Sequence, residues 1–331
     1  MIRRVCQDKE AQIKDLSYAC LKHLEPVTAP LVLISSLPFS GGHYLNQLFD
    51  GHPQIMALPD DMMIGLSLKS FHPTFNQNKT PQQLLESISH EAYSLKSAPF
   101  DEQCKKVHCT SPFVYLPHLQ RLLFIKALDA KEAIKIRYII EAHLTSIFGA
   151  WLNYQKTGPD QKYVAAFVPG EGADELNISH YFDIYPDGKM IFLIMSPEHW
   201  VTQTLMDETE RYKEITDSLD CGEKYVRAVL TTQRKHQNRV RIIDWKDLAT
   251  NAEAVMRYLS GFLGIDYHDI LLKPTFNLSP VASCREAGTE GPGTSGDENL
   301  ASFSISEDQR RVIAEMTNEV YQEVLHQVTV I

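Results

Sequence analysis

The sequence lacks long apolar segments, internal repeats and low-complexity tracts. No apolar run approaches the roughly eighteen residues that a membrane-spanning helix needs. The first residues, MIRRVCQDKEAQ, carry basic side chains without the apolar stretch that follows them in a signal peptide. These absences argue against membrane-spanning, fibrous and repeat proteins. We therefore expect a globular protein located in the cytoplasm.

Positive charge and paired cysteines are also scarce. The chain has 32 Lys and Arg against 42 Asp and Glu, which gives a formal net charge of −10. Broad nucleic-acid binding needs a basic surface, so we expect no nucleic-acid partner, whereas a small anion in a local pocket is compatible with this charge. The six cysteines are scattered, and the closest pair, Cys104 and Cys109, lacks the second pair typical of a zinc site. The sequence predicts reduced thiols and no metal.

The 331 residues carry ordinary hydrophobic (44%) and charged (22%) shares. We expect one α/β domain over 1–331, with helical insertions at about 60–160 and a mobile Gly/Ser-rich loop at about 280–303. Short apolar runs predict buried strands at 31–34, 163–168, 190–195 and 239–243. Helical spacing or capping residues predict helices at 8–25, 44–49, 80–95, 129–156, 251–264 and 306–328, and two others that begin at Pro117 and Pro197. We expect the helix at 8–25 to pack on the sheet. This alternation is typical of a parallel sheet flanked by helices, with ligands at the carboxyl ends of the strands.

The stretch from Leu31 to Pro59 reads as a strand, a tight loop and a helix. The loop SSLPFSGG breaks the apolar run with proline, serine and glycine, and an amphipathic helix follows. A glycine-rich loop that leads into a helix N-terminus directs backbone N–H groups and the helix dipole at one point, which suits phosphate or sulfate. No lysine closes the loop, so an ordinary P-loop is disfavoured. A turn packed for structural reasons alone is the alternative.

This stretch resembles the 5′-phosphosulfate loop of sulfotransferases, with Pro38 to His43 in the loop and His52-Pro53 after the helix. The segment PDGKMIFLIMSPEHWVTQTL resembles the family's second signature, a strand that runs into R-[DN]-P and then a helix. The segment VRIIDWKDLATNAEAVMRYLSGFLGI resembles a third, with Y-E-D-L and F-L-G-[IL]. The three blocks keep the family's order over roughly 30–60 and 160–275. The resemblance implies the sulfotransferase three-layer fold, which is P-loop-like, and the co-substrate 3′-phosphoadenosine-5′-phosphosulfate without a metal.

The resemblance also selects site residues. The donor-binding candidates are Pro38, Phe39, Ser40, Gly41, Gly42, His43, Ser196, Thr202, Gln203, Thr204 and Arg285. The chain departs from the family at three positions where cations are expected. Phe39 and Met195 take the places of two of them, and Phe167-Val168-Pro169 is the nearest counterpart of a K-T-P found in many bacterial members. Losing three charge-assisted contacts would cost on the order of 5–9 kcal/mol, or about four to six decades of affinity. Replacement cations are sought among Lys189, Arg211, Arg227, Lys273 and Arg285.

The activity implied is in-line transfer of a sulfuryl group to a hydroxyl or amine of a small-molecule or glycan acceptor. A base must accept the acceptor's proton, and Asp60, Asp61 and His43 are the candidates. His52 is expected to make a structural hydrogen bond in its turn. The alternative is a binding or assembly protein with this fold that has lost the donor. A nucleotide kinase is a weaker third hypothesis, because a kinase needs a P-loop lysine and magnesium-binding acids.

Overall fold

A five-stranded parallel sheet forms the centre of the computed structural model, which describes residues 2–38, 40–58, 79–91, 114–129, 131, 133–155, 160–170, 175–206, 214–281 and 306–328. The strand order is β2-β3-β1-β4-β5. The strands are β1 (Leu31–Ser36), β2 (Ile55–Ala57), β3 (Tyr163–Pro169), β4 (Lys189–Ile194) and β5 (Val240–Asp244). All neighbouring pairs are parallel, and β1 lies in the middle, between β3 and β4. The predicted central parallel sheet is confirmed.

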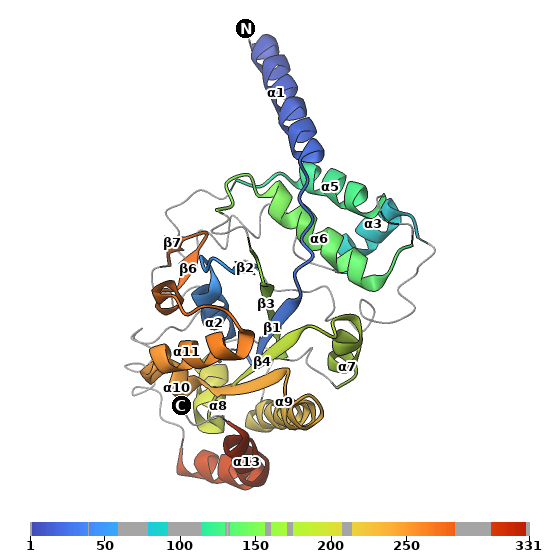
Figure 1. Cartoon of the computed structure of the whole chain (residues 1–331). Helices are drawn as coiled ribbons and strands as arrows, with labels where there is room; N and C mark the ends of the chain where they lie inside the picture. Colours follow the sequence, from blue (N-terminus) through green and yellow to red (C-terminus); the bar gives the residue numbers. More distant parts are fainter. Residues whose placement is uncertain are drawn as a thin grey trace.

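Helices cover both faces of the sheet. On one side in Figure 1 lie α2 (Gly42–Phe49), α10 (Trp245–Thr250) and α11 (Ala252–Leu263). On the other lie α7 (Glu175–Ile184) and α9 (Ile215–Lys235). Every residue of β1 is buried, as expected for a strand with helices on both faces. The α/β three-layer prediction is therefore confirmed.

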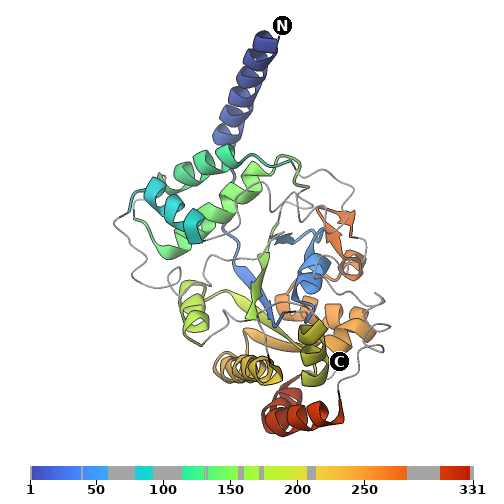
Figure 2. The same cartoon turned by 180° about the vertical axis from the view of Figure 1, so that it is seen from behind.

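The remaining elements lie around this centre. They are α3 (Pro81–Glu91), α5 (Pro117–Asp129), α6 (Ile136–Ala150), α8 (Pro197–Met206), the 3₁₀-helix η3 (Asp269–Leu272), β6 (Thr275–Phe276), β7 (Ser279–Pro280) and α13 (Glu307–Gln327). Figures 1 and 2 show α3, α5 and α6 grouped beyond the end of the sheet at which β1 begins. In the part of the chain that the structure describes, no helix has both the length and the apolar composition to cross a membrane.

The longest predicted helix, 129–156, is shorter in the structure. It begins at Ile136 and ends at Ala150. Trp151 then forms an isolated antiparallel bridge with Tyr115. The N–H of Leu152 donates to the carbonyl of Val114 at 2.8 Å. Backbone pairing with the segment before α5 therefore ends the helix. A search of the sequence for Gly and Pro stop signals does not detect such pairing.

The first helix, α1 (Ile2–Lys22), projects from the body of the molecule beyond α5 (Figures 1 and 2). Two of its apolar side chains, Ile13 and Leu16, are 50% and 40% exposed. The prediction that this helix packs on the sheet is therefore wrong. Helical periodicity indicates an apolar face, but it does not indicate what covers that face.

Two buried tyrosines tie the helices of one face to the β1–β4 pair. The Tyr181 hydroxyl of α7 lies 2.9 Å from the carbonyl oxygen of Leu31 and 3.0 Å from that of Lys189. The Tyr225 hydroxyl of α9 lies 2.8 Å from the carbonyl oxygen of Ser35 and 3.1 Å from that of Leu193. Burial raises the pKa of both phenols, so each stays protonated and donates. Together they connect the two strands at both ends.

Candidate functional site

The glycine-rich loop leaves the carboxyl end of β1, the middle strand, and leads directly into α2. The N–H of Ser40 donates to the carbonyl of Leu37 at 3.1 Å, which closes a tight turn. Gly41 follows with φ of 79°, a left-handed conformation that glycine adopts without a steric penalty. The sequence thus forms the strand, loop and helix predicted from it.

Backbone donors gather at the start of α2. The N–H groups of Gly41, Gly42 and Tyr44 make no hydrogen bond to the backbone of another residue that the structure describes. Unpaired N–H groups at a helix start carry partial positive charge and favour an anion. Ser40 is 2% exposed, and its hydroxyl lies 3.4 Å from the carbonyl oxygen of Pro38. A long contact of this kind leaves the hydroxyl proton available to a ligand oxygen.

Aromatic rings pack against the two glycines. A Cβ atom on Gly41 would lie 2.2 Å from Cε3 of Trp245, and one on Gly42 would lie 2.1 Å from Cε2 of Phe167. The ring of His43 lies 4.2 Å from that of Phe167 between centroids, and Tyr44 meets Trp245 edge-on at 5.8 Å. Phe167 belongs to β3, and Trp245 follows β5. The loop is therefore held between the ends of two other strands.

We expect Gly42→Ala to lower the free energy of unfolding by about 1–3 kcal/mol, because the new methyl overpacks against Phe167. Gly41→Ala should cost about 1–2 kcal/mol more, since alanine at positive φ is also strained. Gly261→Ala is the matched control, because its Cβ would meet no atom within 4 Å inside α11. It should stabilise by about 0.5–1 kcal/mol. Urea unfolding measures the free energies of unfolding of the variants and so checks their expected order. A Gly42→Ala protein as stable as the wild type would contradict this packing.

The second set of candidates lies on α8. Ser196 is exposed at the start of this helix, where its hydroxyl accepts from the N–H of His199 at 3.3 Å. Thr202 donates to the carbonyl of Glu198 at 2.7 Å, and Thr204 to that of Val201 at 2.9 Å. Both threonines and Gln203 are buried. The structure therefore places Ser196 at the carboxyl end of β4, beside β1. The two threonine hydroxyls already donate to backbone carbonyls of their own helix.

Met195, at the position where the resemblance expects arginine, lies in an apolar cluster. It is 7% exposed and lines a cavity of about 30 Å³ together with Leu37, Trp200 and Tyr321. Tyr321 comes from α13, the last helix, which packs on α8 and α9. A cavity of this volume holds about one water molecule. The surroundings of Met195 thus differ in polarity from a phosphate site.

One cation that the sequence did not suggest does reach this region. A cleft of about 220 Å³ between α8 and α13 is lined by Ser196, Glu198 and Arg310. The guanidinium of Arg310 pairs with the Glu198 carboxylate at 3.4 Å, and both side chains are about half exposed. No motif marks Arg310, because only the packing of the last helix brings it next to Ser196.

Comparisons with known proteins find a similarity in the structure but none in the sequence. The sequence matches no family model and no curated protein. The structure, however, is similar to the sulfotransferase domain of the Synechococcus PCC 7002 olefin synthase, with a TM-score of 0.56. That similarity covers 89% of this chain and 96% of that domain, at 15% sequence identity. The chain has the sulfotransferase fold.

Two other sulfotransferase structures are similar at lower scores. The sulfotransferase domain from the curacin biosynthetic pathway has 14% identity and a TM-score of 0.48, over 89% of this chain and 99% of that domain. Mouse sulfotransferase SULT7A1, complexed with PAP, has 13% identity and a TM-score of 0.41, over 94% of each chain.

Within the sulfotransferase fold, the described part of the first loop (Pro38, Ser40 to His43) and Ser196 follow the carboxyl ends of the neighbouring strands β1 and β4. Arg310 lines a cleft with Ser196, and none of the described residues that line this cleft belongs to the loop. Phe39, Asp60, Asp61 and Arg285 lie outside the described residues. Leu58, the last described residue before the two aspartates, follows β2, and its N–H donates to the carbonyl of Ala165 at 2.8 Å. The choice of base among the aspartates and His43 therefore stays a prediction.

The replacement cations differ in where they lie. Lys189 begins β4, at the edge of the sheet opposite the loop, and its ammonium group donates to the carbonyl of Phe262. Arg227, on α9, has a side chain that is 61% exposed and pairs with Glu223 at 2.6 Å. Lys273 is exposed after η3. Arg211 and Arg285 lie outside the described residues. Lys189 thus lies at the wrong edge of the sheet to serve the loop.

His52 has the structural role predicted for it. Its Nδ1 accepts from the N–H of Gln54 at 3.2 Å, so Nε2 carries the proton and donates to the carbonyl of Asp266 at 2.9 Å. Burial lowers its pKa and favours this neutral form. The HP turn is thereby fixed to the segment after α11.

No sequence motif indicates a role for Asp50, at the end of α2. This buried carboxylate accepts from the Thr275 hydroxyl at 2.7 Å and from the N–H of Leu278 at 3.0 Å. Burial raises its pKa, while the two hydrogen bonds act in the opposite direction. Asn277 and Leu278 have positive φ values of 50° and 66° in the turn between β6 and β7. Asp50 therefore holds a strained hairpin against the far end of α2.

Proposed function

We propose that the loop from Leu37 to His43 holds the phosphosulfate end of 3′-phosphoadenosine-5′-phosphosulfate, and that the chain transfers the sulfuryl group to a hydroxyl or amine. The observation that carries this proposal is the set of N–H groups of Gly41, Gly42 and Tyr44 at the start of α2, which donate to no backbone carbonyl within the described part of the chain, on a sulfotransferase fold. These donors and the Ser40 hydroxyl would stabilise the charge that develops on the leaving phosphate oxygen.

In the reaction that we propose, the acceptor oxygen or nitrogen forms a bond to sulfur as the bond from sulfur to the 5′-phosphate oxygen breaks. The acceptor's proton passes to a base, for which Asp60, Asp61 and His43 remain the candidates, and 3′-phosphoadenosine-5′-phosphate leaves. Most of the rate would come from positioning and charge stabilisation, as in phosphoryl transfer. The acceptor would be a small molecule or a glycan.

We propose that Arg310 binds the 3′-phosphate. It lines a cleft with Ser196, and Ser196 follows the carboxyl end of β4, the edge of the sheet from which the loop also leaves. The separate domain prediction, one domain over residues 1–331, remains part of this proposal.

A second candidate function rests on the apolar cluster around Met195. If no cation compensates for Phe39 and Met195, the donor would lose several charge-assisted contacts, each worth about 1.5–3 kcal/mol. The protein would then be a binding or assembly component with the sulfotransferase fold and no donor. The buried position of Met195 beside Leu37 and Trp200 favours this alternative.

Calorimetric titration with 3′-phosphoadenosine-5′-phosphate, at low and at higher salt, tests the proposal. We expect micromolar, salt-sensitive binding that Ser40→Ala and Arg310→Gln each weaken by about tenfold, the loss of one charge-assisted hydrogen bond. Ser260→Ala and Arg311→Gln are the matched controls. Ser260 is a buried serine of α11 that donates to the carbonyl of Met256, and Arg311 is 67% exposed beside Arg310. Absence of binding at millimolar ligand would support the second function instead.

A further inference from the structure

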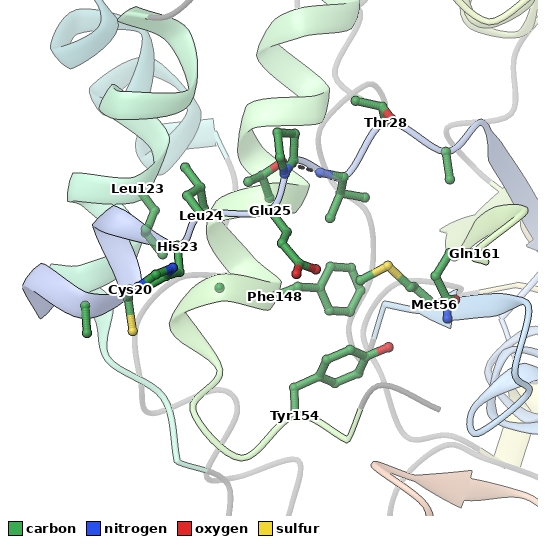
Figure 3. A pocket seen from close by; sticks show the side chains of 16 residues that line it. Cys20, His23, Leu24, Glu25, Thr28, Met56, Leu123, Phe148, Tyr154 and Gln161 are labelled. Carbon is green, nitrogen blue, oxygen red and sulfur yellow. Dashed lines mark hydrogen bonds between the residues drawn. The ribbon is translucent and has the colours of Figure 1, made fainter. Parts of the chain in front are cut away.

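A cavity of about 620 Å³ lies between the end of α1, the linker that follows it, and helices α5 and α6 (Figure 3). Three of the side chains that line it, Met56, Leu123 and Phe148, are apolar and buried. Pockets that hold small organic ligands typically have volumes of about 300–1,000 Å³. The cavity therefore has the size and the apolar wall of a ligand pocket.

The cavity and the candidate donor loop lie at opposite edges of the sheet. Thr28 and Ala29 line the cavity and precede β1, whereas the loop follows β1. The six residues of β1, which lies between them, span about 20 Å. A molecule in this cavity is therefore not the acceptor of a reaction at the loop, and the site stands apart from the proposed sulfuryl transfer.

The described lining of the cavity disfavours an organic anion. None of its sixteen residues is Lys or Arg. A carboxylate that moves from water to an apolar wall without a cation beside it loses its hydration and gains no counter-ion. Glu25, the one carboxylate of the lining, is exposed at the rim and already has an interaction partner within the protein. The lining thus favours an uncharged ligand.

Tyr154 supplies a hydrogen-bond donor within this apolar wall. Its hydroxyl makes no hydrogen bond to any residue that the structure describes, and Figure 3 shows it directed toward the side of the cavity at Met56. Burial raises the pKa of this phenol, so it stays protonated and can donate. The buried Thr145 hydroxyl, by contrast, already accepts from the N–H of Val27 at 2.9 Å. The Tyr154 hydroxyl is therefore available to a ligand oxygen.

The Tyr154 ring is held in place by its neighbours. Its centroid lies 4.9 Å from that of Phe148 and 5.0 Å from that of Trp151. The N–H of Tyr154 donates to the carbonyl of Trp151 at 3.1 Å, and the next N–H, that of Gln155, donates to Oδ1 of Asn277 at 2.8 Å. Because this donor is already fixed, a ligand that accepts from it pays little for ordering the side chain.

We propose that this cavity binds an uncharged, largely apolar small molecule with a carbonyl or ether oxygen, which accepts a hydrogen bond from the Tyr154 hydroxyl. The apolar part of the molecule lies against Leu123 and Phe148. Since α1, the linker, α5 and α6 all contribute to the lining, a bound molecule also joins the projecting helix to the body of the protein.

Three probes of nearly the same shape test the ligand class on the full chain at pH 8. Acetophenone carries an acceptor oxygen, benzoate is anionic, and ethylbenzene has no acceptor. Binding is followed by NMR of isotope-labelled methionine methyl groups, because Met56 lines this cavity and Met195 lines a different one. Acetophenone should shift the Met56 signal, which Met56→Leu assigns, and leave that of Met195 in place. Benzoate should bind about tenfold more weakly or worse.

Tyr154→Phe removes the donor and keeps the ring. The affinity for acetophenone should fall about 2- to 12-fold, the range of one neutral hydrogen bond, while the affinity for ethylbenzene stays unchanged. Tyr138→Phe deletes a hydroxyl of α6 at a position outside the cavity lining and should change neither affinity. Thermal unfolding verifies that each variant is folded.

Three results would overturn the proposal. They are a Met56 signal that does not move at about 10 mM acetophenone, benzoate that binds as tightly as acetophenone, and a Tyr154→Phe protein with wild-type affinity for acetophenone. The first two use the wild-type chain and so do not depend on the folding of a variant. None of the three involves the donor nucleotide, so a failure here leaves the sulfuryl-transfer proposal to its own test.

Discussion

Phe39→Lys combined with Met195→Arg should tighten the binding of 3′-phosphoadenosine-5′-phosphate by about 10²- to 10⁴-fold. Each substitution restores a cation at a position where the sulfotransferase resemblance expects one. Each charge-assisted hydrogen bond to phosphate contributes about 1.5–3 kcal/mol, or about 10- to 150-fold in affinity. Because the backbone donors of Gly41 and Gly42 remain in place, the new cations would add to the donors of the proposed anion site. Titration calorimetry at two salt concentrations measures the gain in affinity and how far salt reduces it.

Charge-neutral and remote variants make this result specific. Phe39→Leu with Met195→Leu changes the same positions without adding charge and should leave affinity unchanged. Tyr18→Lys adds a positive charge on the projecting α1, where the native side chain is 70% exposed. Met195→Arg introduces a charge into an apolar cluster, so Phe39→Lys alone is the decisive variant if the double variant is unstable. An equal gain from Tyr18→Lys would mean that only net charge matters.

Acidification should lower the free energy of unfolding through His143, by about 4–5 kcal/mol once the histidine is fully protonated. This residue lies in α6 and is 4% exposed, and burial lowers its pKa from 6.5 to about 3. Since the folded state holds the neutral ring, the unfolded chain binds the proton first as the pH falls. The stabilisation is therefore complete above pH 6.5 and is lost progressively down to about pH 3.

His143→Met should flatten this pH dependence, because methionine fills a similar volume without titrating. The measurement is the urea midpoint of wild type and variant at pH 7, 5.5 and 4.5, where the difference between them should grow as the pH falls. His118→Met on the exposed face of α5 removes a histidine that is in contact with solvent and should leave the wild-type pH dependence intact. Parallel curves for wild type and His143→Met would rule out this origin of acid sensitivity.

The strands and the loop could be predicted because their signals are local. Apolar runs mark β1, β3, β4 and β5, and the break of SSLPFSGG marks the loop. The strand β2 was not predicted, because its three residues are too few to show a period. Its place at the sheet edge comes from pairing with β3, which is a tertiary contact.

The surroundings of the loop could not be read from the sequence. Trp245 and Phe167 meet the glycines because strand order brings β3 close to β1, and the chain after β5 folds back over the loop. The available signal was that both residues lie at or near the carboxyl ends of predicted strands, the edge at which parallel sheets hold ligands. Arg310 had no such signal, since the packing of α13 alone places it beside Ser196.

The two tyrosine contacts have a consequence for local opening. Tyr181 and Tyr225 each connect β1 with β4, so separating these strands also requires both buried hydroxyls to lose their carbonyl partners. Amide hydrogens of this strand pair should therefore exchange with solvent only in the rarest, near-global openings, whereas the terminal turns of α1 exchange early. Of the four tyrosine contacts, the one from Tyr225 to Ser35 lies nearest the loop, so we expect the candidate site to begin at one of the slowest-exchanging segments of the described chain.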